Sequence, residues 1–222
     1  MTSLEHVATA LSPERPLLIV DADEVLLRFI EHLEVFFLTQ GYELRLTSFR
    51  LAGNIYEQQS NTAAPPQRVT ELIASFFEKC VDTVPAVNGA ASALENLSEQ
   101  YEIVVLTNVP HESRARREAA LWDMGFKYPV LSNAGEKGPA VKALTDKTLH
   151  HTAFVDDLPP QLASVANHAP ATHLVHFVAD PRLAVMIDKA PEAHVRIDDW
   201  AQLQAHLIQL GQMDQPRNTD RR

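Results

Sequence analysis

Short apolar runs alternate with longer amphipathic segments over much of the chain. The runs at 17–20 and 102–106 are too short for helices and are typical of buried strands. Further strands are predicted at 129–132, 152–155, 173–178 and 194–197, and helices at 88–98, 110–125, 137–148, 159–167 and 199–210. Strands that alternate with helices predict an α/β fold, a three-layer core with a Rossmann-like parallel sheet. The capping sequence Thr2-Ser3-Leu4-Glu5 predicts one further short helix before the first strand.

The stretch from 25 to 84 lacks this alternation. Apolar residues recur at helical spacing over 25–37 and again over 69–77, and Pro66 suits the first turn of the second of these helices. Another helix is predicted over 48–58. We therefore expect a small, all-helical cap domain at 25–84. The core is expected to be discontinuous, built from 1–24 and 85–212, and the polar residues 213–222 are expected to be disordered.

Composition narrows the classes of partner. The formal net charge of −10 disfavours nucleic acid, because polyanion binding needs clustered basic residues. A small phosphorylated substrate stays compatible, since a metal ion can offset the acidic field. The single cysteine, Cys80, excludes an intrachain disulfide and fits a reducing compartment. With no signal peptide and no apolar run of the roughly 18–20 residues that a membrane span needs, we expect a cytoplasmic protein without membrane contact, as a monomer or homodimer.

Polar residues follow several of the predicted strands. Asp21 and Asp23 follow the first strand, Thr107 and Asn108 end the second, and Asp156 and Asp157 follow the strand at 152–155; Lys137 lies after Gly135 and before Gly138, at a predicted helix start. In an open parallel sheet, functional groups gather just beyond the carboxyl ends of the strands. The sequence therefore predicts that these residues form one site.

These residue types are suited to phosphoryl chemistry. Neighbouring carboxylates repel each other, and a magnesium ion, which takes oxygen ligands, relieves that repulsion. One carboxylate can attack phosphorus, and a second can act as general acid and base. Threonine and asparagine supply phosphate donors, and a lysine offsets the charge that develops. Each residue alone also fits an ordinary cap or turn, so only the combination indicates a function.

The order of these motifs resembles the haloacid dehalogenase superfamily of phosphohydrolases. The matching segments are LLIVDADEV at 17–25, VVLTN at 104–108, the lysine at 137, and FVDD at 154–157, and the resemblance covers roughly 16–200. It implies a magnesium-dependent phosphomonoester hydrolase that acts on a small phosphorylated metabolite through an aspartyl-phosphate intermediate.

The resemblance also implies a role for each residue. Asp21 would be the nucleophile and Asp23 the general acid and base. Thr107 and the amide of Asn108 would hold the phosphate, and Lys137 would steady the charge. Magnesium would be bound by Asp21, the carbonyl of Asp23, and Asp156, with Asp157 as a further ligand or as a partner of the ligands.

Two further expectations follow from the resemblance. The family inserts a cap between its first and second motifs, and the 25–84 stretch lies at that place. Arg28, Arg50 and Tyr56 are candidates for substrate contact in it. The sequence departs from the family at Glu24, where many members carry glycine, so a carboxylate is expected close to the metal site.

Other hypotheses remain open at this point. A phosphomutase or a 2-haloacid dehalogenase has the same fold, although displacement at carbon has no use for Asp23. A catalytically weak binding or regulatory protein would be consistent with Glu24. A signalling receiver domain uses similar residues in a different order. Arg114, Arg116 and Arg117 are expected on a solvated helix face, and the histidines match no common zinc spacing.

Overall fold

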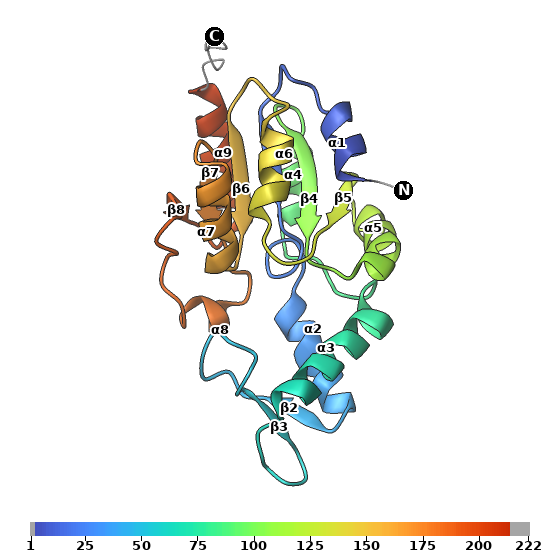
Figure 1. Ribbon diagram of the computed structural model, residues 1–222. Coiled ribbons are helices and arrows are strands. Elements are labelled where there is room, and N and C mark those ends of the chain that lie inside the picture. The colour runs from blue at the N-terminus through green and yellow to red at the C-terminus, as the bar shows by residue number, and fades with distance from the viewer. Residues whose placement is uncertain (1–2, 214–222) are drawn as a thin grey trace.

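Six parallel strands form the centre of the protein (Figure 1). The computed structural model describes residues 3–213. The strands lie in the order β5-β4-β1-β6-β7-β8. Their bounds are β1 Leu17–Val20, β4 Glu102–Thr107, β5 Val130–Ser132, β6 Thr152–Asp156, β7 His173–His176 and β8 Val195–Arg196. The predicted α/β sheet is therefore confirmed. Of the predicted tail, only Met213 lies within the described residues.

Helices cover both faces of the sheet. On one side lie α1 (Leu4–Ala10), α6 (Gly138–Thr145) and α7 (Pro159–His168); on the other lie α4 (Ala90–Leu97) and α9 (Trp200–Gln212), and Figure 1 shows α6 in front of the strands and α4 behind them. Successive residues of β1 explain the two layers. Leu17 and Ile19 pack with the first group of helices, and Leu18 and Val20 pack with the second, because strand side chains alternate between faces.

The remaining helices connect the strands. Strand β4 leads through a short 3₁₀ helix, His111–Ser113, to α5 (Arg114–Asp123). The sequence did not predict α8 (Pro181–Ala184), a single turn after β7. No helix within residues 3–213 combines the length and the apolar character that crossing a membrane requires.

The inserted segment lies between β1 and α4 and contains two helices and a hairpin. Its elements are α2 (Phe29–Thr39), β2 (Tyr42–Leu44), β3 (Ile55–Glu57) and α3 (Pro66–Cys80), with β2 and β3 antiparallel. They lie beyond the carboxyl ends of the core strands (Figure 1). The two long helices were predicted, but α2 begins at Phe29 rather than near residue 25, and the hairpin was not predicted.

The predicted helix over 48–58 is wrong, and with it the prediction of an all-helical cap. Asn54, which is buried, holds this stretch in a loop: its amide nitrogen donates to the carbonyls of Ser48 (2.8 Å) and Arg50 (2.7 Å), and its Oδ1 accepts from Thr47 (2.6 Å). The chain turns at Gly53, directly before Asn54, where a φ of +88° suits glycine. Strand pairing of Ile55 with Leu44 replaces helical hydrogen bonds.

The inserted segment and the core share one hydrophobic cluster. Leu18 and Val20 of β1 belong to the same cluster as Leu33 of α2 and Phe76 of α3. The Phe76 ring lies 5.3 Å from that of Phe29, edge to face. The segment is therefore packed continuously onto the side of the sheet that carries α4 and α9.

Gly138 permits close packing of α6 against α7. A methyl group at this position would overlap the backbone carbonyl and the hydroxyl of Ser164 in α7. We expect Gly138→Ala to lower the free energy of unfolding by about 1–3 kcal/mol, the usual range for overpacking. Urea denaturation checks this, with Gly211→Ala in α9 as the control, because the nearest neighbour there is the mobile end of Gln100 at 3.3 Å. Equal effects of the two substitutions would contradict the explanation.

Candidate active site

A lysine lies between two aspartates at the ends of β1 and β6. Lys137 Nζ is 2.7 Å from Asp21 Oδ1 and 2.7 Å from Asp156 Oδ2, and all three side chains are buried. Strand register brings the acids together, since Val20 pairs with Val155 and the Asp21 amide donates to the Val155 carbonyl at 2.9 Å. The predicted grouping of these three residues agrees with the geometry.

Asp157 adds a third carboxylate. One oxygen each from Asp21, Asp156 and Asp157 lies within 4.8 Å of the others. Burial raises the pKa of Asp156 to about 6, against the opposing attraction of Lys137. Burial also raises the pKa of Asp157 well above its usual value, with repulsion from Asp156 next in importance. Such a group of buried, mutually repelling oxygens fits a divalent cation, which would favour their ionised forms.

The surroundings of Lys137 favour its charged form, unlike those of Asp156 and Asp157. Burial alone would lower the pKa of its amine, but attraction from Asp156 and Asp21 outweighs burial and raises it. Lys137 is therefore a fixed positive charge beside Asp21. It offsets part of the negative charge that the three aspartates bring to the site.

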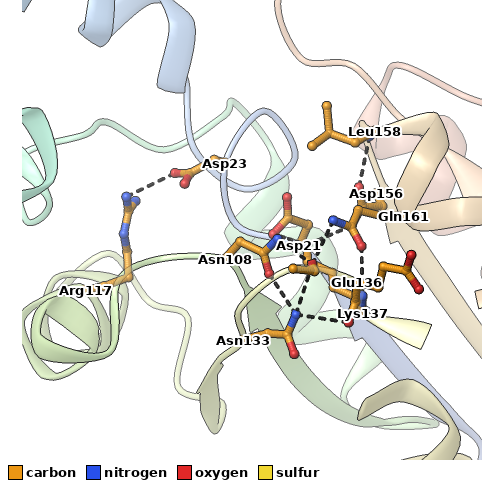
Figure 2. A network of polar contacts seen from close by, with 11 residues as sticks. Asp21, Asp23, Asn108, Arg117, Asn133, Glu136, Lys137, Asp156, Leu158 and Gln161 are labelled. Atoms are coloured by element: carbon orange, nitrogen blue, oxygen red, sulfur yellow. Dashed lines mark hydrogen bonds and ion pairs between the residues drawn. The ribbon is translucent and has the colours of Figure 1, made fainter. Parts of the chain in front are cut away.

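A network of polar contacts positions Lys137 at the start of α6 (Figure 2). Its backbone amide donates to Gln161 Oε1 at 2.8 Å. The carbonyl of Gly135 accepts from Gln161 Nε2 at 3.1 Å and from Asn108 Nδ2 at 2.9 Å. Asn133 Nδ2 donates to Asn108 Oδ1 at 2.9 Å. The side chain of Asn108 thus braces the loop that carries Lys137.

Thr107 ends β4, the neighbour of β1 on the other side from β6. Its hydroxyl is buried and has no hydrogen-bond partner within residues 3–213. A buried hydroxyl without a partner is unfavourable unless a ligand supplies one. Both Thr107 and Asn108 line the same cavity as Asp21. Their position therefore fits an oxyanion such as phosphate.

The carboxylate of Asp23 does not join the other acids. Its Oδ1 lies 3.0 Å from Arg117 Nη2, and Figure 2 shows it pointing toward Arg117, on the side away from Lys137. Burial raises the pKa of Asp23, while the charge of Arg117 lowers it. Any contribution of Asp23 to a metal site in this conformation would come from its backbone carbonyl.

Arg117 is the main residue that the sequence analysis assigned wrongly. It was expected on a solvated face, yet its side chain is 0% exposed. Arg116 is a surface group as expected and pairs with Asp82, whereas Arg114 is only 17% exposed and pairs with Glu118. The available signal was helical spacing, because Arg117 precedes the buried Leu121 by four residues and so shares its face.

Glu24 is buried rather than solvated, and it lies in a left-handed turn with φ +60°. Its carboxylate accepts from the amide of Ile30 at 2.7 Å and from that of Asp180 at 2.9 Å. Its backbone carbonyl accepts from Ala179 at 2.9 Å. Burial raises the pKa of Glu24 to about 7. The hydrogen bonds of Glu24 connect the start of α2 to the loop before α8. These bonds stabilise the left-handed conformation of a residue other than glycine.

A cavity of about 280 Å³ lies above these residues. It is lined by Asp21, Asp23, Glu24, Thr107, Asn108, Lys137 and Asp157 on one side, and by apolar residues of the inserted segment and the core on the other. Of the three candidates for substrate contact, none lines it: Arg28 pairs with Glu31, Arg50 is exposed, and Tyr56 stacks against Arg45. The lining contradicts that expectation, and in the 45–54 loop it is Phe49 and Leu51 that line the cavity in place of Arg50.

His176 braces the acidic loop. Its Nδ1 accepts a hydrogen bond from the amide of Ala190 at 3.1 Å, so Nε2 carries the proton and donates to the Asp157 carbonyl at 3.0 Å. The ring is fully buried, and burial lowers its pKa. His176 therefore fixes the backbone of Asp157 as a neutral imidazole.

The fold matches solved structures of haloacid dehalogenase-like hydrolases. A HAD-family hydrolase from Deinococcus radiodurans with bound phosphate and sodium is 16% identical, with a TM-score of 0.59, over 90% of this chain and 98% of the other. The magnesium-bound hydrolase YfnB from Bacillus subtilis is 15% identical, with a TM-score of 0.58, over 88% of this chain and 99% of the other. A dehalogenase with an intermediate complex is 14% identical, with a TM-score of 0.51, over 88% of this chain and 98% of the other.

Sequence comparison adds no relative. No protein-family model matches the chain, and no curated protein matches it. The chain thus has the haloacid dehalogenase-like fold, as the order of its motifs predicted. Because this fold carries more than one reaction, the function has to be argued from the residues of the site.

Removal of Arg117 tests its pairing with Asp23. We expect Arg117→Met to lower the free energy of unfolding by about 3 kcal/mol, at the low end of the range for breaking a buried ion pair, because the Asp23 side chain keeps 19% exposure. Arg116→Met is the matched control, since Arg116 is 43% exposed and its pair with Asp82 is a surface one. Denaturant titration measures the free energy of unfolding of both variants. Equal losses in the two variants would contradict the pairing of Arg117 with Asp23.

Magnesium should stabilise the protein through the three aspartates. We expect the thermal midpoint to rise with magnesium concentration, and to rise more at pH 7.5 than at pH 5, because the raised pKa values leave fewer ionised ligands in acid. Asp156→Asn should remove most of the effect. Asp146→Asn is the control, because Asp146 is exposed on the surface and pairs with Lys142. If magnesium raised the thermal midpoint of the Asp156→Asn variant as much as that of the unaltered protein, the cation would bind elsewhere.

Proposed function

We propose that this protein is a magnesium-dependent phosphomonoester hydrolase that uses Asp21 as its nucleophile. The observation that carries the proposal is the position of Asp21: its carboxylate contacts the fixed charge of Lys137 and belongs to the buried group of three acids, next to the unpartnered hydroxyl of Thr107. Asp21, Asp156, Asp157 and the Asp23 carbonyl would hold the cation. When bound, magnesium would neutralise phosphoryl oxygens and orient the phosphate toward Asp21.

In the first step, a carboxylate oxygen of Asp21 attacks phosphorus. The bond between phosphorus and the ester oxygen breaks, and Asp23 donates a proton to the departing oxygen. Thr107 and the backbone amide of Asn108 would bind phosphoryl oxygens, and Lys137 would balance their charge. The products of this step are the free alcohol and an aspartyl phosphate on Asp21.

In the second step, water attacks the aspartyl phosphate. Asp23, now ionised, accepts a proton from the water, the bond between phosphorus and Asp21 breaks, and inorganic phosphate leaves. For both steps the Asp23 side chain would turn from Arg117 toward the phosphoryl group. Burial, which raises the pKa of Asp23, favours the protonated form that the first step needs, and the contact with Arg117 gives the side chain a defined position between turnovers.

The cavity supports a reaction that excludes bulk water. Its walls come from both the core and the inserted segment, so the segment covers the acids. Glu24 would keep α2 at a fixed distance from the core strands through its hydrogen bonds to Ile30 and Asp180.

Phosphate release tests the proposal directly. Purified protein with magnesium should release phosphate from members of a panel of small phosphate monoesters. Asp21→Asn should reduce turnover by at least about 10³-fold, in line with removal of other nucleophiles. Asp146→Asn, which removes a surface carboxylate, should keep the rate of the unaltered protein.

The same panel separates the alternatives. Release of halide from 2-haloacids would identify a dehalogenase, and isomeric phosphorylated products without free phosphate would identify a mutase. Magnesium binding with no turnover of any compound would identify a binding or regulatory protein. Full activity of Asp21→Asn would contradict the mechanism itself.

A further inference from the structure

Polar and apolar residues are segregated in the cavity above Asp21. The end next to the strands carries the groups assigned to the cation and the phosphate. The opposite wall is apolar and is formed by Phe29, Ile30, Phe49, Leu51, Phe77 and Leu183. These residues come from α2, the 45–54 loop, α3 and α8, so the wall is built from four separate parts of the chain. A phosphate ester placed with its phosphorus at Asp21 would direct its organic group against this wall.

No group on the wall can bind a second charge or a row of hydroxyls. Of the residues within 3–213 that line the cavity, Lys137 is the single cation, and Asp21 and Asp156 already surround its amine. Arg117, the nearest other buried cation, faces Asp23. Each substrate hydroxyl left without a partner here would weaken binding by a factor of roughly ten.

The apolar wall is held in a defined shape. The rings of Phe29 and Phe77 stack at 5.8 Å with an interplanar angle of 25°, and Phe76 packs edge to face against Phe29 at 5.3 Å. Asn54 fixes the loop that carries Phe49 and Leu51 through its hydrogen bonds to the carbonyls of Ser48 and Arg50. Because these side chains are already held in place, a ligand that packs against them loses little binding free energy to ordering the protein.

We propose that the substrate carries a compact, uncharged, apolar leaving group, such as a single aromatic ring or a branched aliphatic chain. The cavity of about 280 Å³ is slightly smaller than typical ligand sites, whose volumes begin at about 300 Å³, and the phosphoryl group would take part of it. Sugar phosphates, nucleotides and bisphosphates are therefore poor substrates. This inference rests on the proposed function for the orientation of the ester.

Binding of stable phosphonates tests the inference without turnover. With magnesium present, phenylphosphonate should bind at least tenfold more tightly by calorimetry than 2,3-dihydroxypropylphosphonate or phosphonoacetate, which share its phosphoryl end. Equal or reversed affinities would overturn the inference. So would tighter binding of a trimethylammonium-ethyl phosphonate, which would identify a cation site instead.

Two substitutions connect the preference to this wall. Phe49→Ser should reduce the ratio of phenylphosphonate to dihydroxypropylphosphonate affinity by about tenfold. Leu51→Arg should lower the ratio of phenylphosphonate to phosphonoacetate affinity, because Leu51 belongs to the wall and is only partly buried, so an arginine there reaches the ligand without being fully buried. Val35→Ser and Leu38→Arg are matched controls at exposed positions of α2 outside the cavity and should change neither ratio. Unchanged ratios in both test variants would overturn the assignment to this wall.

Turnover of acetyl phosphate separates this inference from the proposed function. Its leaving group is too small to use the apolar wall, so its hydrolysis reports on Asp21 alone. If acetyl phosphate hydrolysis depends on Asp21 but phenylphosphonate is not preferred, the proposed substrate class is overturned while the proposed hydrolase activity is supported. Preferred binding of phenylphosphonate, together with no hydrolysis of acetyl phosphate or phenyl phosphate, would support the apolar site and overturn the hydrolase.

Discussion

The ion pairs of Lys137 with Asp21 and Asp156 are the interaction on which the site depends. Three carboxylates buried within 4.8 Å of one another repel strongly, and a single amine at 2.7 Å from two of them offsets part of that repulsion. The surrounding structure places that amine. Gly138 lets α6 approach α7, Gln161 holds the Lys137 backbone, and Asn108 braces the preceding loop. What remains is an acidic pocket that a divalent cation would complete.

Two buried residues, Glu24 and Arg117, join the turn after β1 to other parts of the chain. Glu24 holds a left-handed turn by accepting from the amides of Ile30 and Asp180, and it thereby joins β1, α2 and the loop before α8. Arg117 reaches Asp23 from α5. A substitution at either position would disturb the geometry around Asp23, although neither residue belongs to the group of three acids. The position of the Asp23 side chain thus depends on distant parts of the chain.

The inserted segment supplies most of the apolar wall of the cavity. Its helices pack on the core through a shared hydrophobic cluster, so Phe29 and Phe77 stand at a fixed place above Asp21. In the proposed hydrolase, the phosphoryl chemistry and the choice of leaving group would be carried by different elements: strand ends for the first, and α2, α3 and the 45–54 loop for the second. This division explains how one fold can host several reactions and substrates.

The sequence by itself determined the α/β core, the strand-end acids, Thr107 and Lys137, because apolar runs and strand order fix which residues meet at one edge of a parallel sheet. It could not determine the loop at 48–54, since the hydrogen bonds of Asn54 override a weak helical pattern. Nor could it determine that Arg117 and Glu24 are buried and paired while Arg50 is exposed. Those outcomes depend on which helix face and which loop residues pack against distant segments, and only the tertiary structure decides that.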